Sequence, residues 1–182
     1  MSCNGEQPAA QLLKISGLLP PNAKVLDLAC GFGRNGKYLA AQGHAVSFLD
    51  KNREVLAEIK QQLPECDIIE ADLECDNPYQ LPQNQYDAIV VFRYLYRPLM
   101  PEIVNALKPN GIIVYETFNH RQAEIGRPRN PDFLLQDGEL ASHFPNFEIC
   151  HQFDGFDKTQ QAFISQFVGI KCLNSVNHRH CI

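Results

Sequence analysis

Short apolar runs alternate along the chain with segments whose apolar residues recur at helical spacing. The runs predict strands, and the segments between them predict helices; the expected strands are 25–28, 45–49, 67–71, 87–92 and 112–115. Strands that alternate with helices form a parallel sheet with helices on both faces. The last two runs, 147–153 and 162–171, have no helix between them and predict an antiparallel hairpin at one edge. Asn52 and Asp137 are expected to cap the helices that follow them, 108–111 is expected to be a turn, and 118–132 is expected to be a long polar connection.

Size, charge and cysteine content narrow the class of protein. The chain has 182 residues, and residues 1–182 are expected to form a single domain. The net charge of −5 argues against generic nucleic-acid binding, which is driven by positive charge. No stretch approaches the ~20 apolar residues of a membrane span, and the N-terminus lacks signal-peptide features. The first of these features predicts no membrane contact. The seven cysteines include no CxxC pair, and together with the missing signal-peptide features they predict reduced thiols and a cytoplasmic location. The oligomeric state stays open.

A glycine-rich loop joins the first predicted strand to a helix. Gly31-Phe32-Gly33-Arg34-Asn35-Gly36 matches the pattern GxGxxG, and Asp50 follows Gly31 by 19 positions. This spacing is typical of an acid that binds the ribose of a dinucleotide. Asp27, on the strand that leads into the loop, weighs against a dinucleotide, because its charge would repel a pyrophosphate.

A cationic cofactor without phosphates, such as S-adenosylmethionine, fits these acids better. The glycines would let the backbone approach the tail of this cofactor closely, because a Cβ would intrude there. Asp50 can accept hydrogen bonds from both ribose hydroxyls, Asp72 can accept from the adenine amino group, and Asp27 can attract the methionyl ammonium. All three lie at the ends of predicted strands, where helix capping and turn formation are the alternative roles. Three such acids together with the glycine loop favour binding.

These motifs carry a family resemblance. The segment from Val25 to Gly33 closely resembles the first motif of class I S-adenosylmethionine-dependent methyltransferases, with Ala29 where the motif usually has glycine. The resemblance continues through Asp50, 70–73, 86–90 and 107–111, and covers residues 9–117. It implies an α/β, Rossmann-like, seven-stranded and mostly parallel sheet that closes with an antiparallel hairpin. The cofactor-binding residues it implies are Asp27, Ala29, Gly31, Gly33, Arg34, Asp50, Asp72, Leu73 and Arg93.

Within that family, one stretch is similar to a particular branch. Residues 33–40, followed by Gly43 and Asp50-Lys51-Asn52, look like the tellurite-resistance methyltransferases. This similarity implies a small nucleophilic acceptor for the methyl group. For Arg34, contact with the methionyl carboxylate and exposure to water both stay open.

Hydrogen-bond donors are concentrated in the segments that follow the fourth and fifth predicted strands. Few acids are close to them in sequence, so they predict a small and anionic or thiol acceptor that enters between the two segments. A thiolate or oxyanion acceptor needs no general base, and none is assigned. The catalytic candidates are Arg93, Tyr94, Glu116 and His120; the other donors are Tyr96, Arg97, Arg121, Arg127 and Arg129.

Two other functions stay open at this level. The pocket could serve a noncatalytic S-adenosylmethionine-binding module, and the glycine loop alone permits an NAD-binding oxidoreductase. A metal site is not expected, because the tail His178-Arg179-His180-Cys181 lacks a second pair of ligands at zinc spacing.

Overall fold

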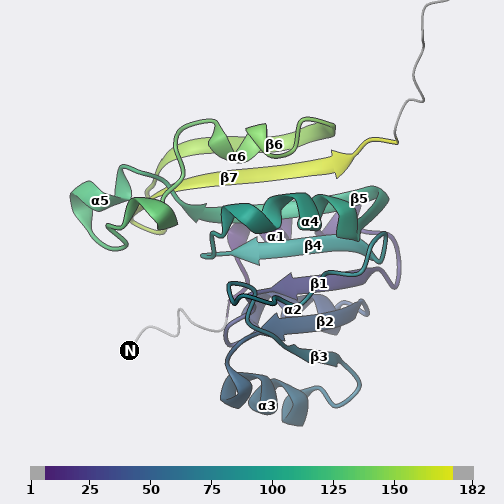
Figure 1. Ribbon diagram of the computed structural model, residues 1–182. Coiled ribbons are helices and arrows are strands. Elements are labelled where there is room, and N and C mark those ends of the chain that lie inside the picture. Colours follow the sequence, from purple (N-terminus) through teal and green to yellow (C-terminus); the bar gives the residue numbers. More distant parts are fainter. Residues whose placement is uncertain (1–6, 174–182) are drawn as a thin grey trace, which may run out of the picture.

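The computed structural model describes residues 7–173 and contains a seven-stranded sheet with the strand order β3-β2-β1-β4-β5-β7-β6 (Figure 1). The first five strands are parallel, and β7 runs antiparallel to both β5 and β6. This arrangement confirms the predicted class I methyltransferase fold with its closing hairpin. The strands are β1 Lys24–Leu28, β2 Ala45–Asp50, β3 Asp67–Glu70, β4 Tyr86–Phe92, β5 Leu107–Phe118, β6 Phe147–Asp157 and β7 Ala162–Lys171.

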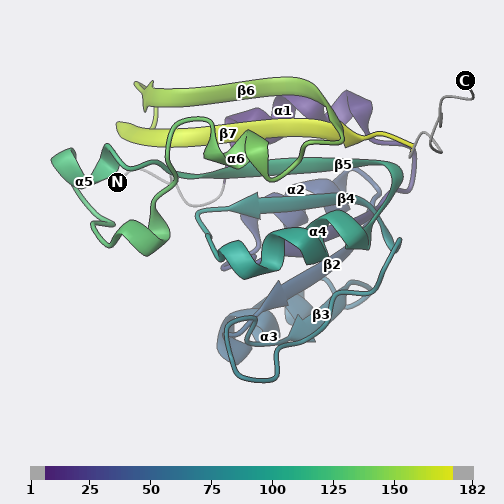
Figure 2. The same cartoon turned by 45° about the horizontal axis from the view of Figure 1, so that its top comes forward.

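Helices cover both faces of the sheet, as Figures 1 and 2 show. The α-helices are α1 Ala10–Ile15, α2 Arg34–Ala41, α3 Arg53–Gln62, α4 Met100–Ala106, α5 Gln122–Ile125 and α6 Glu139–Ser142. Short 3-10 turns lie at Ser16–Leu18, Arg97–Leu99 and Pro131–Phe133.

Two hydrophobic cores follow from the alternation of side chains along each strand. Ile89 and Val91 of β4 pack on the side of α4 and α6, whereas Val90 packs on the side of α1, α2 and α3. All three side chains are fully buried. The continuous apolar run of β4 therefore reflects a strand that is covered on both faces.

Local signals in the sequence set most element boundaries. The Asn52 side chain accepts hydrogen bonds from the N–H groups of Glu54 and Val55, which confirms it as the cap of α3. The expected cap of α6 is wrong, because Gly138 precedes that helix in a left-handed conformation. Asp137 instead accepts a hydrogen bond from Asn119 at 3.0 Å.

The two segments around β5 also differ from expectation. The turn expected at 108–111 lies inside β5, where Asn110 has φ 62° and the pairing with β4 changes register. The long connection 118–132 is not irregular throughout, because it contains α5 and the 3-10 turn Pro131–Phe133. It projects beyond the edge at which the parallel strands end (Figure 1).

Candidate cofactor and acceptor site

The glycine loop after β1 is tied to the end of β2. Gly31 and Gly33 have φ values of 53° and 71°, in the left-handed region that favours glycine. The Gly31 N–H donates to Asp50 Oδ2 at 2.8 Å, and Asp50 Oδ1 accepts from the Asn52 N–H at 2.9 Å. Each oxygen keeps a second lone pair, so Asp50 both fixes the loop and stays available to a ligand.

Packing requires glycine at two positions of the loop, Gly33 and Gly36. A Cβ on Gly36 would lie 2.3 Å from a ring carbon of Phe48 and 2.8 Å from Asp27 Oδ2. A Cβ on Gly33 would lie 2.8 Å from Ile59. Glycine at these positions lets α2 lie directly against β2, whereas a Cβ on Gly31 would meet nothing within 4 Å.

Asp27 is held at the base of the loop. Its side chain is 2% exposed, and Oδ2 accepts from the Gly36 N–H at 2.8 Å. Burial raises the pKa of this carboxyl to about 7, because one backbone hydrogen bond offsets only part of the cost of desolvating the charge. A cationic group placed nearby would stabilise the ionised form.

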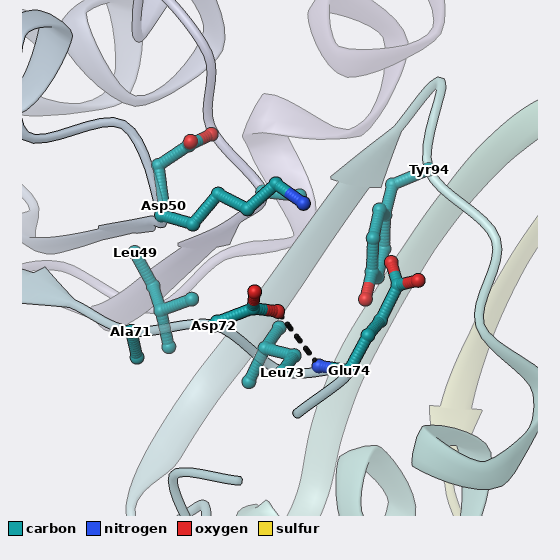
Figure 3. Close-up of a pocket in the computed structure, with 9 residues that line it drawn as sticks. Leu49, Asp50, Ala71, Asp72, Leu73, Glu74 and Tyr94 are labelled. Carbon is teal, nitrogen blue, oxygen red and sulfur yellow. Dashed lines mark hydrogen bonds between the residues drawn. The ribbon is translucent and has the colours of Figure 1, made fainter. Parts of the chain in front are cut away.

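Three cavities follow one another along the carboxyl edge of the parallel strands. The first has a volume of about 130 Å³, and its wall holds three carboxylates, apolar side chains and a tyrosine ring (Figure 3). Asp72 Oδ1 accepts from the Glu74 N–H at 2.9 Å, which leaves Oδ2 open to a ligand. The lining residues are Ala29, Leu49, Asp50, Lys51, Ala71, Asp72, Leu73, Glu74 and Tyr94.

The second cavity, of about 420 Å³, lies over the glycine loop and shares Ala29 with the first. Phe32, at its rim, is 71% exposed. Position 29 holds alanine where the family motif usually has glycine, and this alanine adopts a left-handed φ of 53°. The second cavity is lined by Asp27, Ala29, Cys30, Gly31, Phe32, Arg34, Asn35, Phe92 and Arg93.

The third cavity, of about 600 Å³, shares Arg34 and Arg93 with the second. Its walls come from the segment that leads into α1 and from the turn between β6 and β7, so residues from the two ends of the described chain meet there. The lining residues are Gln7, Pro8, Ala9, Ala10, Gln11, Arg34, Arg93, Asp157, Thr159, Gln160 and Gln166.

Arg93 lines both the second and the third cavity and is paired with Glu116. Arg93 Nη2 lies 3.5 Å from Glu116 Oε1 and donates to Gln160 Oε1, and the guanidinium lies 4.2 Å from the Phe118 ring centroid. Glu116 is 1% exposed, and its Oε2 accepts from Gln166 Nε2 at 2.7 Å. These two catalytic candidates are thus one ion pair, in which Glu116 is buried and Arg93 is partly exposed.

The four donors after β4 do not form one group. Tyr94 lines the first cavity, where burial and the neighbouring Glu74 raise the pKa of its phenol. Arg97 points elsewhere: its Nε donates to Glu139 Oε1 at 2.6 Å, and its two other nitrogens donate to the carbonyls of Asp132 and Leu134, both at 2.9 Å. Arg97 therefore clamps the loop before α6.

The donors after β5 contact their own loop and neighbouring segments, and His120 Nδ1 and Arg121 Nε have no hydrogen-bond partner among the described residues. His120 Nδ1 lies 3.9 Å from Asp137 Oδ1, Arg121 lies 4.7 Å from the Phe163 ring centroid, and Arg129 donates to the Gly126 carbonyl. None of them is among the residues that line the three cavities. The expectation of a donor cluster without acids is therefore wrong, because the fold brings Glu139 next to Arg97 and Asp137 next to His120.

Residues 7–173 contain no group of three or more histidine, cysteine, aspartate or glutamate side chains that could hold a metal ion. They also contain no helix long and apolar enough to cross a membrane. The tail 178–181 lies outside the described residues.

Comparisons with known proteins agree with this geometry. Residues 25–111 match the family described as "Methyltransferase domain". The "Probable S-adenosyl-L-methionine-dependent methyltransferase TehB" of Haemophilus influenzae is 36% identical over 136 residues, or 69% of this chain and 46% of the relative. "Trans-aconitate 2-methyltransferase" of Yersinia pestis (strain Pestoides F) is 30% identical over 114 residues, or 60% of this chain and 43% of the relative. The chain thus spans less than half the length of these curated relatives.

A solved structure gives a match over nearly the whole chain. A TehB-like SAM-dependent methyltransferase from Corynebacterium glutamicum superposes with a TM-score of 0.65 at 26% identity, and the match covers 92% of this chain and 90% of that one. By these comparisons the chain is similar to the class I S-adenosylmethionine-dependent methyltransferases, and its cofactor half resembles the TehB branch. The cofactor of this family is S-adenosylmethionine.

The structure also brings forward residues that the sequence did not single out. Lys51 and Glu74 line the first cavity beside Asp50 and Asp72, and their positions next to those acids were a usable signal. Gln11 and the residues of the β6–β7 turn line the third cavity. No motif marked them, because they meet the glycine loop only through the fold.

Proposed function

We propose that this protein transfers the methyl group of S-adenosylmethionine to a small anionic acceptor. The observation that carries the proposal is that three cavities are neighbours, because the first and second share Ala29 in their walls and the second and third share Arg34 and Arg93. An adenosine, a methionyl tail and an acceptor need such a succession of sites along one edge of the sheet.

The first cavity suits the adenosine. We assign Asp50 to the ribose hydroxyls and Asp72 to the adenine amino group, because each carboxylate keeps an unused acceptor position beside an apolar wall. Leu73 and Tyr94 supply apolar surface for the base. This assignment gives Tyr94 a role in cofactor binding instead of one at the reacting methyl.

The second cavity suits the methionyl tail. Gly31 lines it, and the buried Asp27 offers a negative charge to the ammonium. Arg34 is placed to meet the carboxylate, although its Nη1 also donates to the Gln7 carbonyl at 3.4 Å. Bound S-adenosylmethionine supplies an electrophilic methyl group on a positively charged sulfur.

The chain's own task is to align and desolvate the acceptor. An acceptor oxygen forms a bond to the methyl carbon while the carbon–sulfur bond breaks and its electron pair stays on sulfur, which leaves a methyl ester and S-adenosylhomocysteine. An anionic oxygen carries no proton to remove, so Glu116 can remain paired with Arg93 and no base is required. The substrate in the name of the trans-aconitate relative supports a carboxylate acceptor.

The test combines binding with turnover. Calorimetry is expected to detect S-adenosylhomocysteine but not NAD, and labelled methyl from S-adenosylmethionine is expected to pass to carboxylates in a panel that also holds thiols, other oxyanions and RNA. Binding without transfer to any acceptor would favour a noncatalytic module. Because of the net charge of −5, we expect no RNA binding that weakens steeply with salt.

A further inference from the structure

The third cavity contains a polar side chain whose burial is not explained by the fold. Gln11 is 5% exposed, and neither its Oε1 nor its Nε2 has a hydrogen-bond partner within residues 7–173. Burying an amide without hydrogen-bond partners is unfavourable, because the group loses its hydrogen bonds to water and gains none in return. Gln11 also lines the third cavity, so its two free groups border a space that is large enough for a small molecule.

A second unmet group faces the same space. Arg93 Nη1 is buried and has no hydrogen-bond partner in the described part of the chain, whereas Nη2 already contacts Glu116 and Gln160. Gln160 and Gln166 in turn donate to Glu116, so the guanidinium is held in one position. A donor that is fixed, buried and unused is suited to bind an anion.

The segment that carries Gln11 is fixed to the cofactor loop. The Ala9 N–H donates to the Oδ1 atom of Asn35, a buried residue of α2, at 2.9 Å. The neighbouring Arg34 donates to the Gln7 carbonyl. Gln11 therefore has a defined position relative to the second cavity, where the methyl group is expected.

From these three observations we infer that Gln11 and Arg93 recognise a carboxylate of the methyl acceptor in the third cavity. The carboxylate accepts from Gln11 Nε2 and from Arg93 Nη1, and Gln11 Oε1 accepts from a hydroxyl or a protonated acid on the same molecule. The acceptor class is a small carboxylic acid with at least one further hydrogen-bond donor. This inference rests on the proposed function, and it moves the acceptor from the loop after β5 to the side of α1 and the β6–β7 turn.

The first experiment measures turnover with trans-aconitate and a panel of small hydroxy and dicarboxylic acids as probes. Gln11→Leu removes both polar groups and keeps the bulk, so the acceptor KM is expected to rise at least tenfold while the KM for S-adenosylmethionine stays within twofold. Gln11→Glu keeps the shape and repels a carboxylate, so it should weaken the acceptor further. Gln61→Leu, at an exposed glutamine of α3, is the matched control.

A second measurement does not depend on a stable variant. In ¹⁵N-labelled protein saturated with S-adenosylhomocysteine, the Gln11 side-chain amide resonance should shift on addition of the acid that is turned over, and the Gln61 amide should not. Wild-type kinetics in Gln11→Leu, or an unmoved Gln11 amide, overturns the inference. So does a wild-type protein that binds S-adenosylhomocysteine but methylates no carboxylate. Failure to bind S-adenosylhomocysteine at all would instead remove the proposed function.

Discussion

Asp50 offers the sharpest test of the cofactor site, because it has two duties that can be separated. It holds the glycine loop through the Gly31 N–H at 2.8 Å, and it is assigned to the two ribose hydroxyls. A hydrogen bond to a charged group contributes about 1.5–3 kcal/mol, so Asp50→Ala is expected to lose about 3–6 kcal/mol of cofactor binding. That loss corresponds to a Kd about 10²–10⁴-fold higher.

The assay is calorimetric titration with S-adenosylhomocysteine, with circular dichroism and thermal unfolding as checks of the fold. Asp50→Asn separates the two duties, because its amide oxygen can still accept from Gly31 while its nitrogen cannot accept from a hydroxyl. It should therefore bind more tightly than Asp50→Ala and more weakly than wild type. Asp76→Ala, at an exposed acid outside the cavities, is the control. A folded Asp50→Ala protein with wild-type affinity would refute the placement of the ribose.

Three other predictions concern the scaffold around the site. The raised pKa of Asp27 means that the folded state holds its proton up to about pH 7, so the free energy of unfolding should fall between about pH 4 and 7, by at most about 1.4 kcal/mol per pH unit. Denaturant titrations should find that slope reduced in Asp27→Asn. Gly36→Ala should destabilise by about 1–3 kcal/mol, because its Cβ meets Phe48; an unchanged melting temperature would contradict this packing. Arg97→Met should lower stability by at least about 2 kcal/mol by freeing Glu139 and two carbonyls, and S-adenosylhomocysteine affinity should remain that of wild type.

The cofactor half was predictable because its signals are local and the fold gathers them by rule. Asp50 closes β2, Asp72 follows β3 and Arg93 follows β4, and parallel strands bring their carboxyl ends to one edge. The sequence positions alone therefore placed these residues together. Asn52 was equally readable, since a cap bonds to N–H groups two and three positions ahead.

The glycine loop was located correctly but explained incompletely. From the sequence, glycine was attributed to close approach of the cofactor. In the structure, Gly33 and Gly36 are confined by Ile59 and Phe48, which belong to α3 and β2. Such contacts depend on the spacing between layers, and a one-dimensional pattern carries no information about that spacing.

The acceptor side was not readable, because pairing of charges there is a property of tertiary contacts. Arg97 and Glu139 are 42 positions apart, and no periodicity relates them. A cluster of arginines counted along the sequence therefore overstates the positive charge that a ligand meets. Gln11 could not be predicted for the same reason, because it joins the site only where α1 and the β6–β7 turn line one cavity.

The charges around the third cavity determine how an anion can be selected there. Arg34 and Arg93 supply two positive charges, but Asp157 shares the wall and Glu116 is paired with Arg93, so the formal charges cancel. A small acid is therefore not attracted by a net positive field. It gains by meeting donors in fixed positions and by lying next to the sulfonium charge that the second cavity is proposed to hold. Recognition of this kind discriminates by the arrangement of hydrogen bonds, since a poorly placed anion gains nothing from the surrounding charge.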